Sequence, residues 1–178
     1  MSTIRTITAE STTVVDAPVA AVWRLIVEQF ADIDQWSSGV NRSQGTAPGA
    51  NGQAGERACE IAAAGFQDTS ERVVEAVPRT RFRYELYDGL PGFVVGAENT
   101  WTFAPEGSGT RLTGRTEMRI EGIMGLLGGR PMRRSSRKAL DSMTREAKYM
   151  IEHGRPHPDK VKAAARYRRK HPETVAAG

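Results

Sequence analysis

The feature that most constrains the fold is a long amphipathic segment near the C-terminal end of the chain. Pro131 lies at its start, and apolar or small residues then recur at steps of three and four residues to about His153. Gly154 and Pro156 end the segment. At 1.5 Å per residue, such a helix reaches roughly 33 Å, which is enough to cross a whole sheet. The stripe consists of Met132, Ser136, Leu140, Met143, Ala147, Met150 and Ile151.

Six segments before this helix have the alternating or β-branched residues of strands, and turn residues separate them. No helical pattern lies between the later ones, so we expect an antiparallel sheet rather than parallel βαβ units. After the first strand, Asp16 and Pro18 mark the start of a short helix that extends to Phe30, and a second helical piece covers residues 31–35. A link rich in glycine and alanine, residues 45–55, follows. The strand-like segments are 5–15, 56–63, 68–76, 81–87, 94–103 and 110–120.

The positive charge lies mainly outside the expected domain. The 178-residue chain has a formal net charge of +4, yet seven basic and only two acidic residues follow His153. We therefore expect one domain over residues 1–153 and a basic tail over 154–178 that can form a short helix. A nearly neutral domain argues against specific nucleic-acid binding. The tail could bind nucleic acid or anionic lipid non-specifically, or simply keep the protein soluble.

Two features indicate a cytoplasmic protein. The opening residues, MSTIRTITAE, lack the basic stretch and the apolar stretch of a secretory signal. Cys59 is the only cysteine, so no intramolecular disulfide can form, which suits a reducing compartment. We interpret Cys59 as a small buried residue rather than a reactive thiol.

Several short motifs occur in a fixed order along residues 4–153. They are Val14–Pro18 followed by Val22 and Trp23, Asp34 with Trp36, Gly55 and Arg57 followed by Gly65, Glu71 and Tyr84, the segment 101–112, and Lys148–Glu152. Together they resemble the SRPBCC (START/pollen-allergen-like) superfamily, and within it the polyketide cyclase/dehydrase and lipid-transport group. The resemblance implies an α+β helix-grip fold: a seven-stranded antiparallel sheet wrapped around a long C-terminal helix, with two short helices after the first strand. It also implies a cavity for a small hydrophobic ligand between sheet and helix.

Strand parity indicates which side chains would line this cavity, because alternate residues of a strand point to the same face. Ordinary core packing is the alternative explanation for the large apolar members of the set. The expected ligand-binding residues are Trp36, Arg57, Tyr84, Asn99, Trp101, Met118, Met143, Tyr149 and Met150.

Arg57 and Asn99 are the two polar residues whose side chains the strand alternation places on the inner face of the sheet. A buried arginine is costly unless it is paired, so Arg57 should meet either a carboxylate such as Glu71 or an oxygen-bearing ligand. In the second case Arg57 and Asn99 would orient a ligand oxygen, and Tyr84 would offer a phenolic donor. Acid–base chemistry would require Glu71 or Glu98 to have a pKa raised by burial.

The histidines limit the chemistry that the domain can perform. All three, His153, His157 and His171, lie at or beyond the end of the long helix, so a serine or cysteine triad and a histidine-rich zinc centre are not expected in the body. No phosphate-loop or dinucleotide motif is present. We therefore expect no metal and no cofactor, and the sequence identifies no catalytic residue. Three functions stay open: binding of a hydrophobic lipid, polyketide or aromatic molecule, polyketide cyclase/dehydrase-type catalysis, and an accessory role at a membrane or partner.

A cluster of cations opens the long helix, at the end where the helix dipole disfavours positive charge. Their spacing places them on one helical face, next to the apolar link that contains Ile123, Met124, Leu126 and Leu127. This pattern is typical of a surface for an anionic membrane or an acidic partner. A solvated face beside a buried loop is the alternative, and the sequence does not indicate an oligomeric state. The cations are Arg130, Arg133, Arg134, Arg137 and Lys138.

Overall fold

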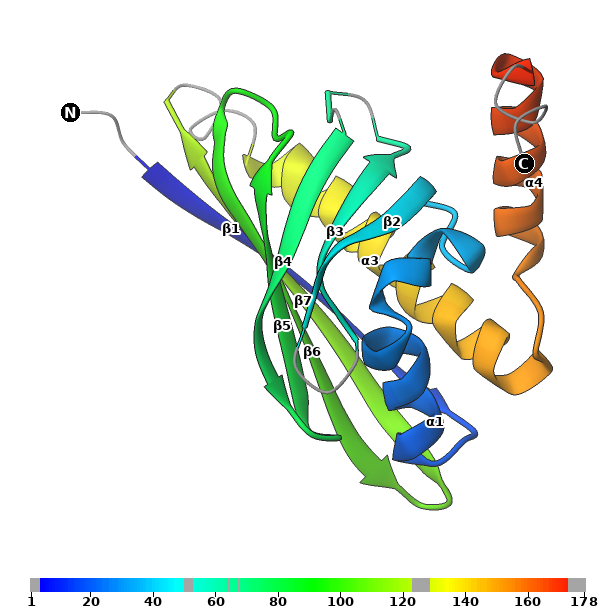
Figure 1. Ribbon diagram of the computed structural model, residues 1–178. Coiled ribbons are helices and arrows are strands. Elements are labelled where there is room, and N and C mark those ends of the chain that lie inside the picture. Colours follow the sequence, from blue (N-terminus) through cyan, green and yellow to red (C-terminus); the bar gives the residue numbers. More distant parts are fainter. Residues whose placement is uncertain (1–3, 50–52, 64, 67, 123–128, 173–178) are drawn as a thin grey trace.

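The computed structural model describes residues 4–49, 53–63, 65–66, 68–122 and 129–172. Its strands form one antiparallel sheet in the order β1-β7-β6-β5-β4-β3-β2, which curves around a long helix, α3 (Figure 1). The sheet has seven strands, as the resemblance implies. The strands are β1 Ile4–Val15, β2 Val40–Pro48, β3 Ala54–Ile61, β4 Asp68–Val77, β5 Arg81–Asp88, β6 Val94–Glu106 and β7 Gly109–Glu121.

Strand β2 is the element that the sequence pattern did not mark. It lies at one edge of the sheet, and its first residue, Val40, is the only buried one. An edge strand away from the core needs no apolar alternation, so its sequence looks like a polar link. The expected glycine- and alanine-rich link therefore overlaps both β2 and β3.

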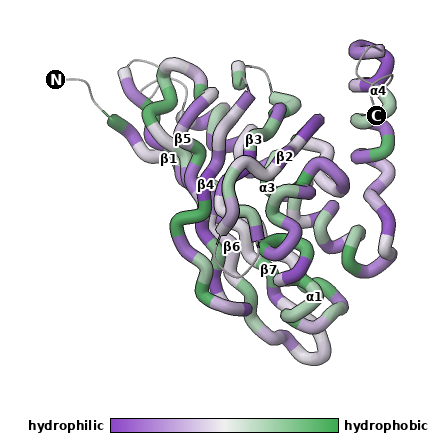
Figure 2. The backbone as a smooth tube through the Cα atoms, in the orientation of Figure 1, coloured by the Kyte–Doolittle hydropathy of each residue, from purple (hydrophilic) through white to green (hydrophobic). Residues whose placement is uncertain are grey.

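Three short helical turns connect β1 to β2. They are α1 Val19–Trp23, the π-helical turn η1 Arg24–Glu28 and the 3-10 turn η2 Phe30–Gln35. Their apolar residues cover one end of the inner sheet face. There the Phe30 ring meets Phe82 edge-on at a centroid distance of 5.4 Å and Tyr84 in a tilted arrangement at 5.1 Å. In Figure 2 the hydrophobic colour gathers on α1 and the adjacent strands.

Helix α3, Gly129–His153, ends as predicted at Gly154, whose positive φ of 65° is a conformation that glycine adopts easily. Its buried face differs from the predicted stripe. Leu140 and Ala147 are buried, but so are Thr144 and Glu146, whereas Met143 and Met150 are only half-buried. The helix therefore meets the rest of the protein through polar as well as apolar side chains.

Helix α4, Pro158–Lys170, lies in the basic tail, beside β2. Pro158 occupies its first turn, where the missing N–H costs no hydrogen bond. Lys160 is buried and donates to the Val40 carbonyl at 2.8 Å. Tyr167 donates to Glu60 on β3 at 2.6 Å. The helix thus shields part of an edge strand that would otherwise be open.

Candidate functional site

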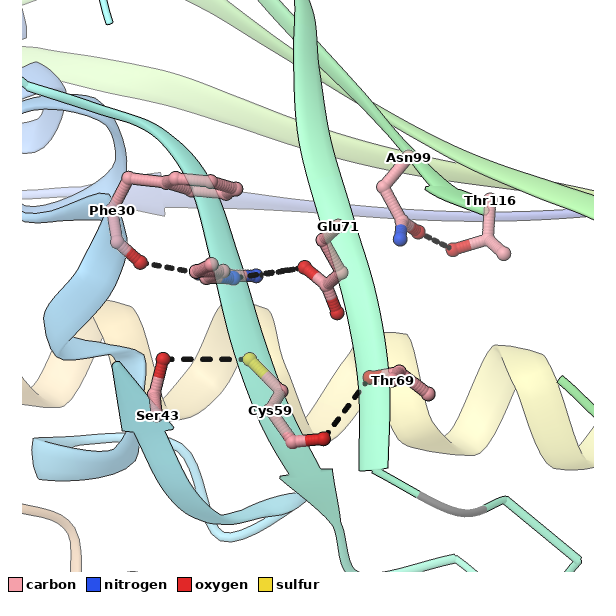
Figure 3. A network of polar contacts seen from close by, with 8 residues as sticks. Phe30, Ser43, Cys59, Thr69, Glu71, Asn99 and Thr116 are labelled. Carbon is pink, nitrogen blue, oxygen red and sulfur yellow. Dashed lines mark hydrogen bonds and ion pairs between the residues drawn. The ribbon is translucent and has the colours of Figure 1, made fainter. Parts of the chain in front are cut away.

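The inner sheet face carries one charged pair deep in the core. Arg57 on β3 and Glu71 on β4 are cross-strand neighbours, and each is 3% exposed. Arg57 donates through Nε and Nη2 to the same carboxylate oxygen of Glu71, at 2.8 and 2.6 Å, and through Nη1 to the Phe30 carbonyl (Figure 3). Burial alone would lower the pKa of the guanidinium, but the Glu71 charge outweighs it and raises that pKa further. The structural partner expected for Arg57 is therefore present.

Aromatic rings surround this pair. The Arg57 guanidinium carbon lies 3.8 Å from the centre of the Phe30 ring and 5.0 Å from that of Tyr84, so both rings contribute cation–π stabilisation. Burial and the Glu71 charge raise the pKa of the Tyr84 phenol, and the Arg57 charge and a hydrogen bond from Trp101 only partly offset that rise. Tyr84 is therefore a neutral phenol at neutral pH, suited to donating a hydrogen bond rather than to acting as a base.

A small space, which we call the Trp36 pocket, lies beside the pair, between the sheet and the turns η1 and η2. It measures about 10 Å³, and Trp36, Arg57, Tyr84 and Trp101 lie on its walls. Four predicted ligand-binding residues thus share one lining. The Trp36 indole nitrogen is buried and has no hydrogen-bond partner among the described residues. A buried N–H without an acceptor costs roughly 1–3 kcal/mol, so an acceptor bound at this donor would be stabilising.

Asn99 lies next to Tyr84 across β5 and β6, and it marks a more open part of the same face. Asn99 and its β7 neighbour Thr116 are half-buried, although Trp101 and Met118, two residues further along each strand, are buried. The Thr116 hydroxyl donates to the Asn99 side-chain oxygen. Solvent therefore reaches the middle of the inner face, and the Asn99 amide nitrogen has no bond to another described residue there.

Residues 6–148 match the family model described as "Polyketide cyclase / dehydrase and lipid transport". The chain belongs to this family. It matches no curated protein. The assignment confirms the resemblance to the SRPBCC superfamily that the motifs carry.

Several solved structures share the fold. A START superfamily protein from Mycobacterium smegmatis has a TM-score of 0.67 at 14% identity, covering 82% of this chain and 97% of that one. A protein from Thermus thermophilus gives 0.66 at 21% identity, with coverages of 84% and 99%. The di-domain ARO/CYC StfQ from the steffimycin biosynthetic pathway gives a TM-score of 0.69 at 18% identity. The match covers 84% of this chain and 51% of that one. The helix-grip fold is therefore established.

The remaining predicted site residues of this polyketide cyclase/dehydrase and lipid transport domain lie apart from the Trp36 pocket. Met118 is buried on the inner face, and Met143 and Met150 on α3 pack half-buried against the core. Tyr149 stacks on His153 at 4.2 Å and meets His157 edge-on at 5.0 Å, which places it at the junction of α3 and α4. A ligand role for these four residues stays a prediction.

Sequence patterns missed a buried polar junction between η2, α3 and α4. Glu146 on α3 accepts 2.7 and 2.6 Å hydrogen bonds from the backbone N–H and the hydroxyl of Ser38. Burial raises the pKa of Asp34 and lowers the pKa of Lys160, and the opposite charge of each partly offsets the shift of the other. These groups hold the segment that carries Trp36 in place. In the sequence, Glu146 is one polar residue of an amphipathic helix, and its position there looks like that of a solvent-exposed side chain.

Glu146, His157 and Asp159 bring three possible metal-ligand atoms within 4.8 Å of one another. Each group is already engaged: Glu146 by Ser38, Asp159 by Arg145 at 2.9 Å, and His157 Nδ1 by the Asp159 N–H. A cation there would also meet the Arg145 charge. We interpret the cluster as the joint between the two C-terminal helices.

Cys59 on β3 is buried, and it does not line the Trp36 pocket. Burial raises its pKa to about 11, which the nearby Arg57 charge only partly counters. The thiol is therefore protonated and unreactive at neutral pH, as the sequence interpretation expected. The apolar link residues Ile123, Met124, Leu126 and Leu127 lie outside the described residues. No described helix combines the length and apolarity needed to cross a membrane.

Proposed function

We propose that the protein binds a small, largely apolar molecule with oxygen acceptors on the inner sheet face, between the sheet, η2 and α3. The observation that carries this proposal is the buried indole N–H of Trp36, unpartnered among the described residues, on a residue that lines a pocket of mainly aromatic and aliphatic side chains. An apolar pocket with a few polar groups is the usual form of a small-molecule site.

The buried polar side chains that line the pocket, those of Trp36, Arg57 and Tyr84, all carry donors, whereas Gln29 in the lining is exposed. Besides the Trp36 indole, the Asn99 amide nitrogen is unbonded among described residues, and Arg57 uses three of its five N–H groups on Glu71 and Phe30. Glu71 is occupied by Arg57. Such a set favours carbonyl, carboxylate or hydroxyl oxygens on an otherwise apolar ligand, and it disfavours a cationic one.

Binding must enlarge the pocket. A space of about 10 Å³ is close to the minimum for one water molecule, whereas ligand pockets measure roughly 300–1,000 Å³. Opening toward Asn99 requires less disruption than lifting η2, because solvent already reaches Asn99 while Ser38 and Val40 are bonded to buried side chains. The half-buried Met143 and Met150 are flexible enough to repack around a ligand.

Native mass spectrometry of freshly purified protein, followed by denaturing extraction, tests for a bound molecule. The matched variants are Trp36→Phe, which removes the N–H together with part of the ring, and Trp23→Phe, which removes the same atoms where the ring packs on Phe103. We expect Trp36→Phe to weaken binding of the extracted molecule by roughly fivefold to tenfold, the value of one hydrogen bond, while Trp23→Phe leaves affinity unchanged. A ligand-free protein that also fails to bind fatty acids or aromatic polyketides would contradict the proposal.

Polyketide cyclisation or dehydration in the same pocket is the second candidate. It is favoured by Arg57 and the neutral Tyr84 phenol, which can both hold a carbonyl oxygen as negative charge develops on it. Product analysis after incubation with a reactive poly-β-ketone tests it. Tyr84→Phe should then slow turnover without weakening binding, whereas unchanged product ratios with and without the protein would leave binding as the function.

A further inference from the structure

A groove outside the Trp36 pocket runs along the first half of β1. Its volume is about 1090 Å³, and Thr8, Ala9 and Glu10 form one wall while residues 130–138 of α3 form the other. A hollow of about 470 Å³ that shares Thr8, Arg130 and Arg133 lies next to it. The two together form an elongated depression between a strand edge and a helix.

Strand β1 is an edge of the sheet, and α3 runs alongside it in the same direction (Figure 1). Two contacts close the second half of this edge. Lys148 donates to the Val14 carbonyl at 2.7 Å, and Glu152 accepts from the Asp16 N–H at 2.7 Å. The chain therefore covers its own edge there with side chains of α3.

Among the described residues, none covers the first half of the edge in this way. The hydroxyls of Thr12 and Thr113 are 2.9 Å apart, as expected for a pair whose backbone groups point away from each other. The same parity directs the N–H and C=O groups of Thr8 and Glu10 away from β7 and toward the open edge. Within the described part of the chain, no side chain of α3 bonds to these groups.

The helical wall of the groove is strongly basic. Arg130, Arg133, Arg134, Arg137 and Lys138 are all exposed, and in the described ranges Arg137 is the one with an acidic partner, Asp141 at 3.6 Å. Of the described residues in the lining, Glu10 is the one acidic residue, and it also faces Arg115 at 4.0 Å. Two copies of this chain joined by their β1 edges would bring two such basic walls together, so charge disfavours self-association through this edge.

We propose that this groove binds an extended acidic segment of a partner protein, which adds a strand to the open edge of β1 and pairs its carboxylates with the arginines of α3. Unpaired backbone groups on one wall call for a partner with its own N–H and C=O groups, which a lipid headgroup does not supply in a row. Residues 130–138 span about 12 Å of helix, close to two steps of roughly 6.8 Å between same-side residues of a strand. Acidic residues at alternate positions would therefore meet successive turns of the helix.

The test is fluorescence anisotropy with a short labelled peptide in which glutamate alternates with threonine. Two control peptides change one property each: glutamine replaces glutamate, or alternate backbone nitrogens carry a methyl group. We expect only the parent peptide to bind. The double substitution R133E/R134E should weaken binding by roughly tenfold or more, whereas R168E/R169E, the same charge change on exposed positions of α4, should have no effect.

Thr8→Pro provides a variant that spares the arginines. An edge strand tolerates proline where its N–H faces away from the sheet, so the protein should fold but lose peptide binding. Equal binding of the methylated peptide would overturn strand addition and leave a merely electrostatic surface. Binding of phosphatidylserine vesicles or duplex DNA through Arg133 and Arg134, with no binding of the peptide, would overturn the proposed partner class.

Discussion

Removing one member of the Arg57–Glu71 pair should destabilise the protein far more than removing both. Arg57→Met removes both guanidinium bonds from the carboxylate of Glu71, a residue that is 3% exposed in the native protein. Breaking a buried ion pair in this way costs about 3–5 kcal/mol. For a domain of this size, about 2–4 °C of Tm accompanies each kcal/mol, so the expected fall in Tm is roughly 6–20 °C. Glu71→Leu should cost a similar amount, because it leaves the buried Arg57 guanidinium without its carboxylate partner.

The double variant R57M/E71L replaces the pair by apolar side chains. Its main loss is the donor to the Phe30 carbonyl, which costs about 1–3 kcal/mol if no water replaces it. The two single costs add to more than this, so the double-mutant cycle should show a coupling of at least about 3 kcal/mol. Urea unfolding monitored by circular dichroism gives the free energy of unfolding of the wild type, the two single variants and the double variant on one scale.

The outcome that would refute the reasoning is additivity: a double variant as unstable as the two singles combined. That result would mean that both side chains are hydrated in solution and do not depend on each other. Ligand affinity of the double variant separates the two roles of Arg57. Unchanged affinity would make Arg57 purely structural, whereas a loss of affinity beyond that of a matched core variant would place it against the ligand.

Three further predictions concern the elements that hold this site. Gly114→Ala should cost about 1–3 kcal/mol in thermal unfolding, because the added carbon would lie 3.0 Å from both Leu140 and the Trp101 ring. Ser38→Ala should cost about 1–3 kcal/mol, because a carboxylate oxygen of the buried Glu146 loses its hydroxyl donor. Glu152→Gln should flatten the acid side of a Tm-against-pH curve. Burial raises the pKa of Glu152, but bonds from Asp16 and Lys148 outweigh it and leave that pKa below its usual 4.5, so its stabilisation is present above pH 4.5 and lost as the pH falls through the folded value. An unchanged acid limb in Glu152→Gln would contradict the assignment.

Strand parity predicted the inner face well because a strand has a fixed period of two. Arg57 and Tyr84 were assigned inward from alternation alone, and the structure buries both. The partner of Arg57 could also be anticipated, since few acidic residues have inward parity on a neighbouring strand. Local pattern and tertiary burial agree wherever one sheet face is dry.

The junction around Glu146 shows why the rest could not be predicted in the same way. Its burial depends on η2, α3 and α4 meeting, and no local period records such a meeting. Lys160 is another case, because in a run of seven basic tail residues nothing separates the one buried lysine from its solvated neighbours. The Trp36 donor belongs to the same class: its missing partner becomes visible only when every neighbour is placed.

The two halves of α3 serve different purposes, and this has a consequence for the site. From Leu140 onward Thr144 and Lys148 bond to β1 and Glu146 bonds to Ser38, which follows η2, so this half is fixed by buried or bonded side chains. Before Leu140 its described residues are exposed or half-buried, and the inner face opposite holds the half-buried Asn99 and Thr116. Movement that admits a ligand should therefore occur at the first half of α3. A segment bound along β1 would contact that same half, so occupancy of the groove and opening of the pocket should be energetically coupled.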